Sequence, residues 1–190
     1  QVYLHKASVA YERMLIAALL RAKELAAKGE ELFASPALRF FLYNDVDRPR
    51  FYDDPACLEN FIRLDDNDIW TSLKVWCGHP DKVLSTLSTG MVDRRLFKVE
   101  ISTEPATEER KQELTAQIAA ALDVTPAEAA WFVSVPRIEK NMYNPADDSI
   151  DILYKDGTTK NIAEASDMLN IQLLSKKVKK YYLCYLRLHR

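Results

Sequence analysis

The chain has 190 residues, of which 48% are hydrophobic and 28% charged, and its formal net charge is −2. This composition is typical of a globular protein with one sizeable core or two small lobes. The near-neutral charge excludes a surface that is basic all over, as non-specific nucleic-acid binders have. With only four glycines, a glycine-rich phosphate loop is not expected. No apolar run approaches the roughly 18 residues of a membrane span, so we expect no membrane partner.

Helical periodicity dominates the first half of the chain. A wide apolar stripe that includes Val9, Ile16 and Leu20 predicts a helix over residues 2–28, and Gly29 is a typical C-terminal stop. Because this helix starts close to Gln1, we expect the chain to be part of a longer protein. The remaining predictions for this half are helices at 30–42 (with a new start at Ser35-Pro36), 57–64, 65–78 and 80–90, and a surface loop at 43–56.

The second half changes period and predicts short strands between helices. Asp156-Gly157 between two alternating segments is a strong signal for a β-hairpin. The sequence therefore predicts an α+β fold, with a helical N-terminal domain at 1–92 and a small C-terminal lobe at 93–190 that has a mainly antiparallel sheet. Its predicted strands are 96–101, 131–135, 150–155, 158–162 and 178–188, and its predicted helices are 105–122 and 164–174.

Motifs for catalysis and metal binding are absent from the sequence. It contains no adjacent His-Asp pair, HExxH, CxxC, GxGxxG or GxxxxGK[ST]. The acidic run Asp65-Asp66-Asn67-Asp68 lacks the alternation of a calcium loop and is better explained as a helix cap. We therefore expect no catalytic residue and no bound metal within this chain. Its only histidines are His5, His79 and His189.

Cysteines and basic residues give weaker indications. Cys57, Cys77 and Cys184 are few and widely spaced, which favours free, buried thiols and a cytoplasmic location. The tail at 176–190 carries basic residues and no acid. It is either a solvated face or a patch that meets phosphate or an acidic partner. Its basic residues are Lys176, Lys177, Lys179, Lys180, Arg187 and Arg190.

Two ordered segments resemble a known family. The first is Val2-Tyr3-Leu4-His5-Lys6. The second runs from Leu64-Asp65-Asp66 through Trp76-Cys77-Gly78-His79-Pro80 to Arg94-Arg95-Leu96-Phe97-Lys98. Their order and separation resemble the region downstream of the catalytic core in HD-domain dNTP triphosphohydrolases, a group that includes bacterial dGTPase-like proteins and the SAM- and HD-domain dNTPase. The resemblance covers residues 1–101.

This resemblance implies the C-terminal region of a metal-dependent phosphohydrolase. The family's metal ligands, a His, a His-Asp pair and a later Asp, would all precede Gln1. In the full-length protein a divalent metal would activate water for attack on the α-phosphate of a nucleotide substrate, which releases nucleoside and triphosphate. The resemblance also implies a homo-oligomer.

Five residues receive roles from the resemblance. Tyr3 matches a tyrosine that borders the substrate nucleoside. His5 and Lys6 match positions near a regulatory nucleotide and a subunit interface, while Arg94 and Lys98 match basic residues that hold an effector nucleotide in some members. Structural roles compete with each of these: a packing aromatic, surface residues at a helix start, and charges that guard a strand edge.

A different function stays open at this stage. The absence of catalytic groups and the basic tail also suit a non-catalytic module for oligomerisation, or for binding an effector or nucleic acid. The sequence does not specify the preferred nucleotide or the metal.

Overall fold

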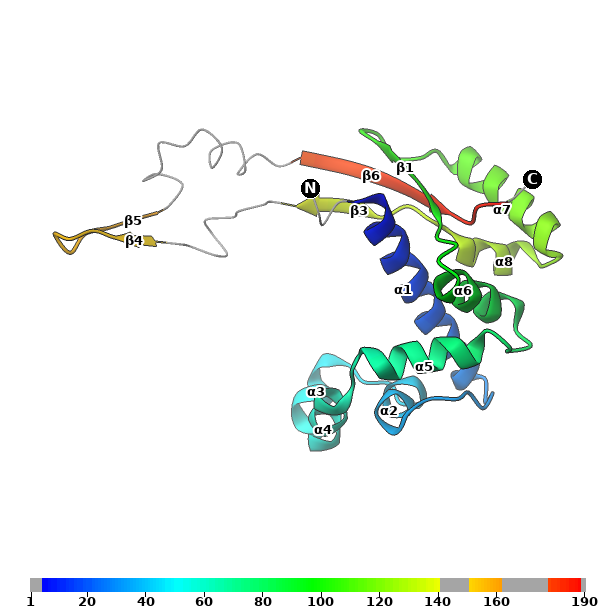
Figure 1. Cartoon of the computed structure of the whole chain (residues 1–190), viewed down its shortest axis with the longest axis horizontal. Helices are drawn as coiled ribbons and strands as arrows, with labels where there is room; N and C mark the ends of the chain where they lie inside the picture. The colour runs from blue at the N-terminus through cyan, green and yellow to red at the C-terminus, as the bar shows by residue number, and fades with distance from the viewer. Residues whose placement is uncertain (1–4, 141–150, 162–177, 189–190) are drawn as a thin grey trace.

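A computed structural model describes residues 5–140, 151–161 and 178–188, which form an α+β fold, as the sequence predicts (Figure 1). Figure 1 shows α1 running from the sheet toward the helices α2 and α5. The helices are α1 (Lys6–Ala27), α2 (Pro36–Tyr43), α3 (Arg48–Asp53), α4 (Pro55–Arg63), α5 (Asp66–Trp76), α6 (Lys82–Val92), α7 (Glu108–Leu122) and α8 (Pro126–Ala129), followed by a 3₁₀ turn, η2 (Ala130–Phe132). The strands are β1 (Lys98–Ser102), β2 (Val133–Ser134), β3 (Arg137–Lys140), β4 (Asp151–Leu153), β5 (Thr159–Asn161) and β6 (Val178–Tyr185).

Strand β6 is the centre of the main sheet. It pairs antiparallel with β1, so that Lys98 lies opposite Tyr185 and Val99 opposite Cys184. Strands β2 and β3 pair antiparallel with the other edge of β6. This arrangement confirms the mainly antiparallel sheet. Strands β4 and β5 form a separate hairpin whose turn contains Gly157 at φ 83°, a left-handed conformation that glycine adopts without strain.

The helices α1 and α6 pack closely because α6 contains a glycine at the contact. A Cβ atom at Gly90 would lie 2.7 Å from Cε of Met14 and 3.2 Å from the carbonyl oxygen of Arg95. Met14 also accepts a hydrogen bond at Sδ from the backbone N–H of Phe97, at 3.3 Å. The glycine thus lets α6 and the start of β1 rest directly on α1.

A buried ion pair fixes the start of α6 against α1. Arg21 donates from Nε and Nη2 to the two carboxylate oxygens of Asp81, at 3.1 and 2.5 Å, and its side chain is only 9% exposed. Asp81 is also the N-cap of α6 and accepts from the backbone N–H of Leu84 at 2.8 Å. Burial raises the pKa of Asp81, but the hydrogen bonds from Arg21 and Leu84 outweigh it, so the net pKa is lowered.

One buried cluster joins the two predicted domains. It contains Met14 and Leu87 from the helical half together with Phe97, Phe132 and Tyr182 from the sheet half. The core therefore continues across the predicted boundary at residue 93, and the division into two domains stays a prediction.

Local structure departs from the sequence predictions in several places. The predicted loop at 43–56 is wrong, because Asp47 caps a short helix there, α3, by accepting from Arg50 N–H at 2.9 Å. The helix predicted at 30–42 begins only at Pro36, after an N-cap at Ser35. The short helix α8 and strand β3 were not predicted, and the helix predicted at 164–174 lies outside the described residues.

Candidate anion-binding cavity

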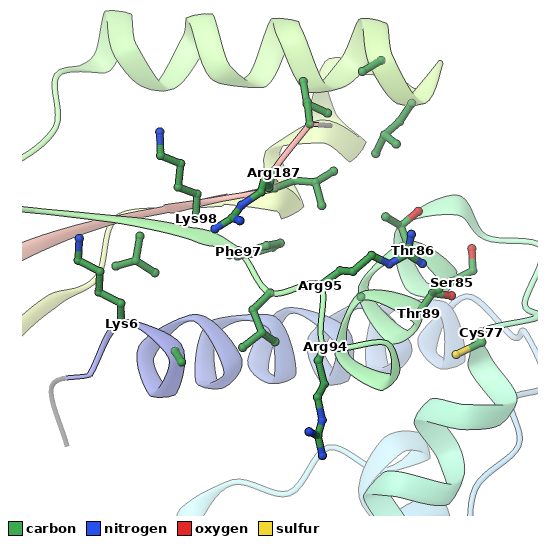
Figure 2. A pocket seen from close by; sticks show the side chains of 18 of the residues that line it. Lys6, Cys77, Ser85, Thr86, Thr89, Arg94, Arg95, Phe97, Lys98 and Arg187 are labelled. Atoms are coloured by element: carbon green, nitrogen blue, oxygen red, sulfur yellow. The ribbon is translucent and has the colours of Figure 1, made fainter. Parts of the chain in front are cut away.

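An open cavity of about 1050 Å³ lies where the start of α1, the helix α6, strand β1 and the residues after β6 meet (Figure 2). No aspartate or glutamate lines it, although the chain as a whole is slightly acidic. A cavity with cations and no carboxylates attracts anions, and its walls concentrate that field. The cationic side chains that line it are Lys6, Arg94, Arg95, Lys98 and Arg187, and the imidazole of His5 lines it too.

Arg94 and Arg95 follow the end of α6 and both line the cavity, but the side chain of Arg94 points away from Lys98 and Arg187 (Figure 2). The N–H of Arg95 bonds to the carbonyl of Gly90 at 2.7 Å, and that of Arg94 bonds to the carbonyl of Met91 at 3.2 Å. This pattern is a Schellman motif, in which the residue at Arg94 must be left-handed; its φ is 59°. Glycine is the usual residue at this position. An arginine there costs about 1 kcal/mol in backbone strain.

The two arginines leave the chain in different directions (Figure 2). Arg95 forms an ion pair with Asp93 at 2.6 Å, so part of its charge is compensated within the chain. Arg94 is exposed and has no ion pair within the described residues. Arg94 is therefore available to an external anion, and Arg95 is a weaker contributor.

Lys98 is held at the mouth of the cavity by two neighbours in the sheet. Its Nζ lies 3.2 Å from Oε1 of Glu100 and 5.5 Å from the centre of the Tyr185 ring. Tyr185 in turn donates from its hydroxyl to Glu100 at 2.6 Å. The side chains of Tyr185 and Glu100 raise the pKa of Lys98, and the carboxylate of Glu100 compensates part of its charge, as Asp93 does for Arg95.

The N-terminus of α1 contributes backbone polarity to the same cavity. Nδ1 of His5 accepts from the N–H of Ala7 at 3.3 Å, which makes His5 the N-cap of α1. The first turn of α1 contains no acidic residue that would neutralise the positive end of the helix dipole. Lys6 is exposed beside it and has no ion pair among the residues that the structure describes. This end of the cavity therefore favours negative charge.

Helix α6 forms the opposite wall of the cavity and contributes hydroxyl groups to it. Ser85, Thr86 and Thr89 line the cavity, and all three are partly exposed (Figure 2). Phe97, only 4% exposed, also lines the cavity and presents an apolar surface. Hydroxyls and an aromatic surface beside cations suit a ligand that has both phosphates and an apolar or ring-shaped part.

Sequence reasoning identified part of this site. His5, Lys6, Arg94 and Lys98 all line the cavity, while their predicted role in holding an effector is not tested by this geometry. Tyr3 lies outside the described residues. The residues that were missed are Arg95, Arg187 and the hydroxyls of Ser85, Thr86 and Thr89.

Sequence features did indicate some of the residues that were not predicted. Arg187 belongs to the basic tail, whose role was left open, and it is exposed at the cavity. Lys180, another member of that tail, is exposed too. The hydroxyls at 85, 86 and 89 follow the polar side of an amphipathic helix, which could have been read from its period.

The described residues do not offer a metal site. No group of three or more His, Cys, Asp or Glu side chains converges anywhere in the ranges that the structure describes. The acidic run at Asp65 forms a capping box with Asp68, which confirms the capping prediction. The cysteines are free, and Cys57 and Cys184 are buried. The described part of the chain also contains no helix long and apolar enough to cross a bilayer.

Fold and cavity together define an α+β protein with a cationic cavity suited to phosphate groups. Comparison with protein-family models gives no match, and neither does comparison with curated proteins. Among solved structures, the chain is similar to a phosphohydrolase from Bacteroides thetaiotaomicron, with 74% sequence identity and a TM-score of 0.86. The match covers 97% of this chain and 46% of that chain, so this chain spans less than half the length of its relative.

Proposed function

We propose that this chain is part of a phosphohydrolase that acts on (deoxy)nucleoside triphosphates, and that its basic cavity binds the polyphosphate of a regulatory nucleotide. The observation that carries the proposal is the set of cations around a cavity that no carboxylate lines. The 74% identity with part of a phosphohydrolase supports the enzyme class.

The chemistry of the cavity fits a nucleotide better than a simple anion. Lys6 and Lys98 place ammonium groups near the start of α1, while Arg94 and Arg187 provide planar guanidinium groups that can bind phosphate oxygens in pairs. The hydroxyls of α6 can bond to a sugar or a base edge. A ligand with several phosphates and a ring would use all of these groups at once.

Hydrolysis itself needs groups that these residues do not supply. The described residues do not fit a divalent metal, so we derive no metal-assisted step from them. In this proposal a catalytic part outside the sequence would hold the metal, and Tyr3 would border the substrate nucleoside. The nucleotide specificity, the proposed homo-oligomer and the cytoplasmic location require their own experiments.

Calorimetric titration of the chain with dGTP and with inorganic triphosphate tests the cavity. We expect both ligands to bind. Binding should weaken as salt is raised, because dissolved ions screen the attraction between the phosphates and the exposed cations of the cavity, over a length of about 10 Å at 0.1 M salt. Lys6→Gln and Arg187→Gln should each reduce affinity about fivefold, the equivalent of about 1 kcal/mol for an exposed charge pair.

Lys74→Gln is a matched control, because Lys74 is an exposed lysine on α5 that does not line the cavity. If this control weakens dGTP binding as much as Lys6→Gln, attraction to the whole molecule, and not the cavity, explains the affinity. A parallel assay mixes the chain with dGTP and Mg²⁺, Mn²⁺ or Co²⁺. Release of triphosphate by the chain alone would contradict a catalytic part that lies elsewhere.

A non-catalytic module that binds nucleic acid is the second candidate, and the exposed basic residues Lys180 and Arg187 favour it. Single-stranded oligonucleotides bind through many phosphates, so their affinity falls more steeply with salt than that of a mononucleotide. Competition between dGTP and an oligonucleotide separates the two ideas. Displacement of dGTP by the oligonucleotide at much lower concentration would favour this candidate.

A further inference from the structure

Helix α1 carries an apolar surface that the described residues leave uncovered. The segment Met14-Leu15-Ile16-Ala17-Ala18-Leu19-Leu20 is apolar without interruption and spans about two helical turns, so it is apolar on every side. A helix that is apolar all round is normally buried all round. Met14 and Ala18 are fully buried, yet Ile16 is 39% exposed and Leu20 is 54% exposed.

The uncovered side forms a groove. A cavity of about 350 Å³ lies between α1 and the stretch from α8 to β2. We call it the α1 groove and define it by Arg13, Ile16, Leu20, Trp131 and Val133, which line it together with Ala17, Ala127, Ala130 and Ser134. Its floor is apolar and aromatic, which is the composition that helix-in-groove recognition uses.

Arg13, at the rim of the α1 groove, has a hydrogen-bond donor that needs an acceptor. Its Nη2 bonds to Glu12 at 3.0 Å, but its Nε is buried and has no hydrogen-bond partner among the described residues. A buried donor without an acceptor costs about 1–3 kcal/mol. Whatever covers the groove should therefore bring an acceptor as well as apolar side chains.

We propose that the α1 groove is the docking surface for a companion part of the same polypeptide, which presents an apolar helix face and one hydrogen-bond acceptor. The similar Bacteroides phosphohydrolase extends well beyond the match, since only 46% of its chain is covered. The companion part corresponds to the uncovered remainder of that chain. This inference rests on the proposed place of the chain in a longer phosphohydrolase, but not on nucleotide binding in the basic cavity.

A second copy of the chain fits the groove less well. A two-fold dimer is isologous, so each copy would have to present the α1 groove and also the ridge that fills it. Within the described residues, Ile16 and Leu20 line this concave surface together with Trp131. Two copies that met here would bring these same lining residues against each other, whereas a companion part can present a complementary surface of its own.

Cysteine labelling tests the proposal. Leu20→Cys is made in this chain, and a cysteine is placed at the aligned position of the full-length Bacteroides phosphohydrolase. We expect rapid maleimide labelling in this chain alone and at least tenfold slower labelling in the full-length protein. Peptide mass spectrometry distinguishes the new cysteine from Cys57, Cys77 and Cys184.

Glu113→Cys serves as the control, because Glu113 lies on the exposed side of α7 and away from the α1 groove. Its labelling rate should change less than twofold between the two proteins. Equal labelling of the Leu20 position in both would show an open groove and overturn the proposal. Slow labelling of Leu20→Cys in this chain alone would also overturn the proposal, because a second copy or another segment of this chain would then cover the α1 groove. Sedimentation would distinguish a second copy from a segment of the same chain.

Discussion

Replacing Arg94 by glycine should stabilise the fold while it weakens the site. Arg94 occupies the left-handed position of the Schellman motif at φ 59°, where a side chain costs about 1 kcal/mol. Glycine removes that cost, but it also gives the unfolded chain more conformational freedom, which lowers the free energy of unfolding by about 0.5 kcal/mol. The net gain in the free energy of unfolding is about 0.5 kcal/mol. For a chain of this size it raises the Tm by about 1–2 °C.

Urea denaturation and calorimetry on the same variants measure both effects. Arg94→Ala is the matched control: it loses the same charge but keeps the Cβ atom, so its stability should stay within about 0.5 kcal/mol of the parent. Both variants should bind dGTP about fivefold more weakly. The reasoning is refuted if Arg94→Gly is less stable than Arg94→Ala, or if either variant binds dGTP as tightly as the parent chain.

Three further predictions concern packing, charge and the cavity. Asp81→Asn should cost about 1–3 kcal/mol in urea denaturation, because Arg21 loses its bidentate carboxylate and keeps only Glu24, at 2.9 Å, as an ion-pair partner. Gly90→Ala should cost about 1–3 kcal/mol through overpacking, whereas Gly78→Ala should be nearly neutral, because a Cβ there would meet only one atom, at 3.8 Å. Saturating dGTP should slow the alkylation of Cys77, which lines the cavity, as mass spectrometry can measure.

The Asp81 prediction also has a pH dependence. The pKa of Asp81 is lowered from 3.8, so the folded state binds this proton less readily than the unfolded chain. The stabilisation is therefore present above pH 3.8 and is lost as the pH falls through the lower, folded-state pKa. Asp81→Asn should show a shallower acid transition than the parent. Asp123→Asn is the control; its carboxylate pairs with Lys82 but is fully exposed, so acid unfolding should be unchanged.

Two outcomes would contradict the remaining predictions. Equal stability of the Gly90→Ala and Gly78→Ala variants would mean that α1 and α6 can separate without loss, against the close contact with Met14. Unchanged alkylation of Cys77 at saturating dGTP would mean that the nucleotide lies elsewhere.

The helical half was largely predictable, because its period and its caps are local signals. The sequence predicts a helix start at Ser35-Pro36 and a cap within the acidic run, at Asp66 or Asn67; the structure confirms Ser35 and places the second cap one residue earlier than predicted, at Asp65. The short helix α3 was missed because Asp47 and Pro49 also suit a loop, and only the hydrogen bond to Arg50 decides between them. Propensity does not separate a capped turn of helix from a polar loop.

The cavity was only partly predictable, because its residues are far apart in the sequence. Arg94 and Lys98 belong to one motif, but Arg187 reaches the site only because β6 pairs with β1. Strand pairing over such a separation depends on the tertiary fold and leaves no local pattern. The strained backbone at Arg94 was equally hidden, since sequence alone does not show which residue a helix end makes left-handed.

A crystal structure of this chain with dGTP is the most direct test of the account. The account predicts that phosphate oxygens lie within hydrogen-bond reach of Lys98 and Arg187, with the nucleoside toward the hydroxyls of α6. A nucleotide bound at another surface, with the basic cavity holding only solvent, would contradict it.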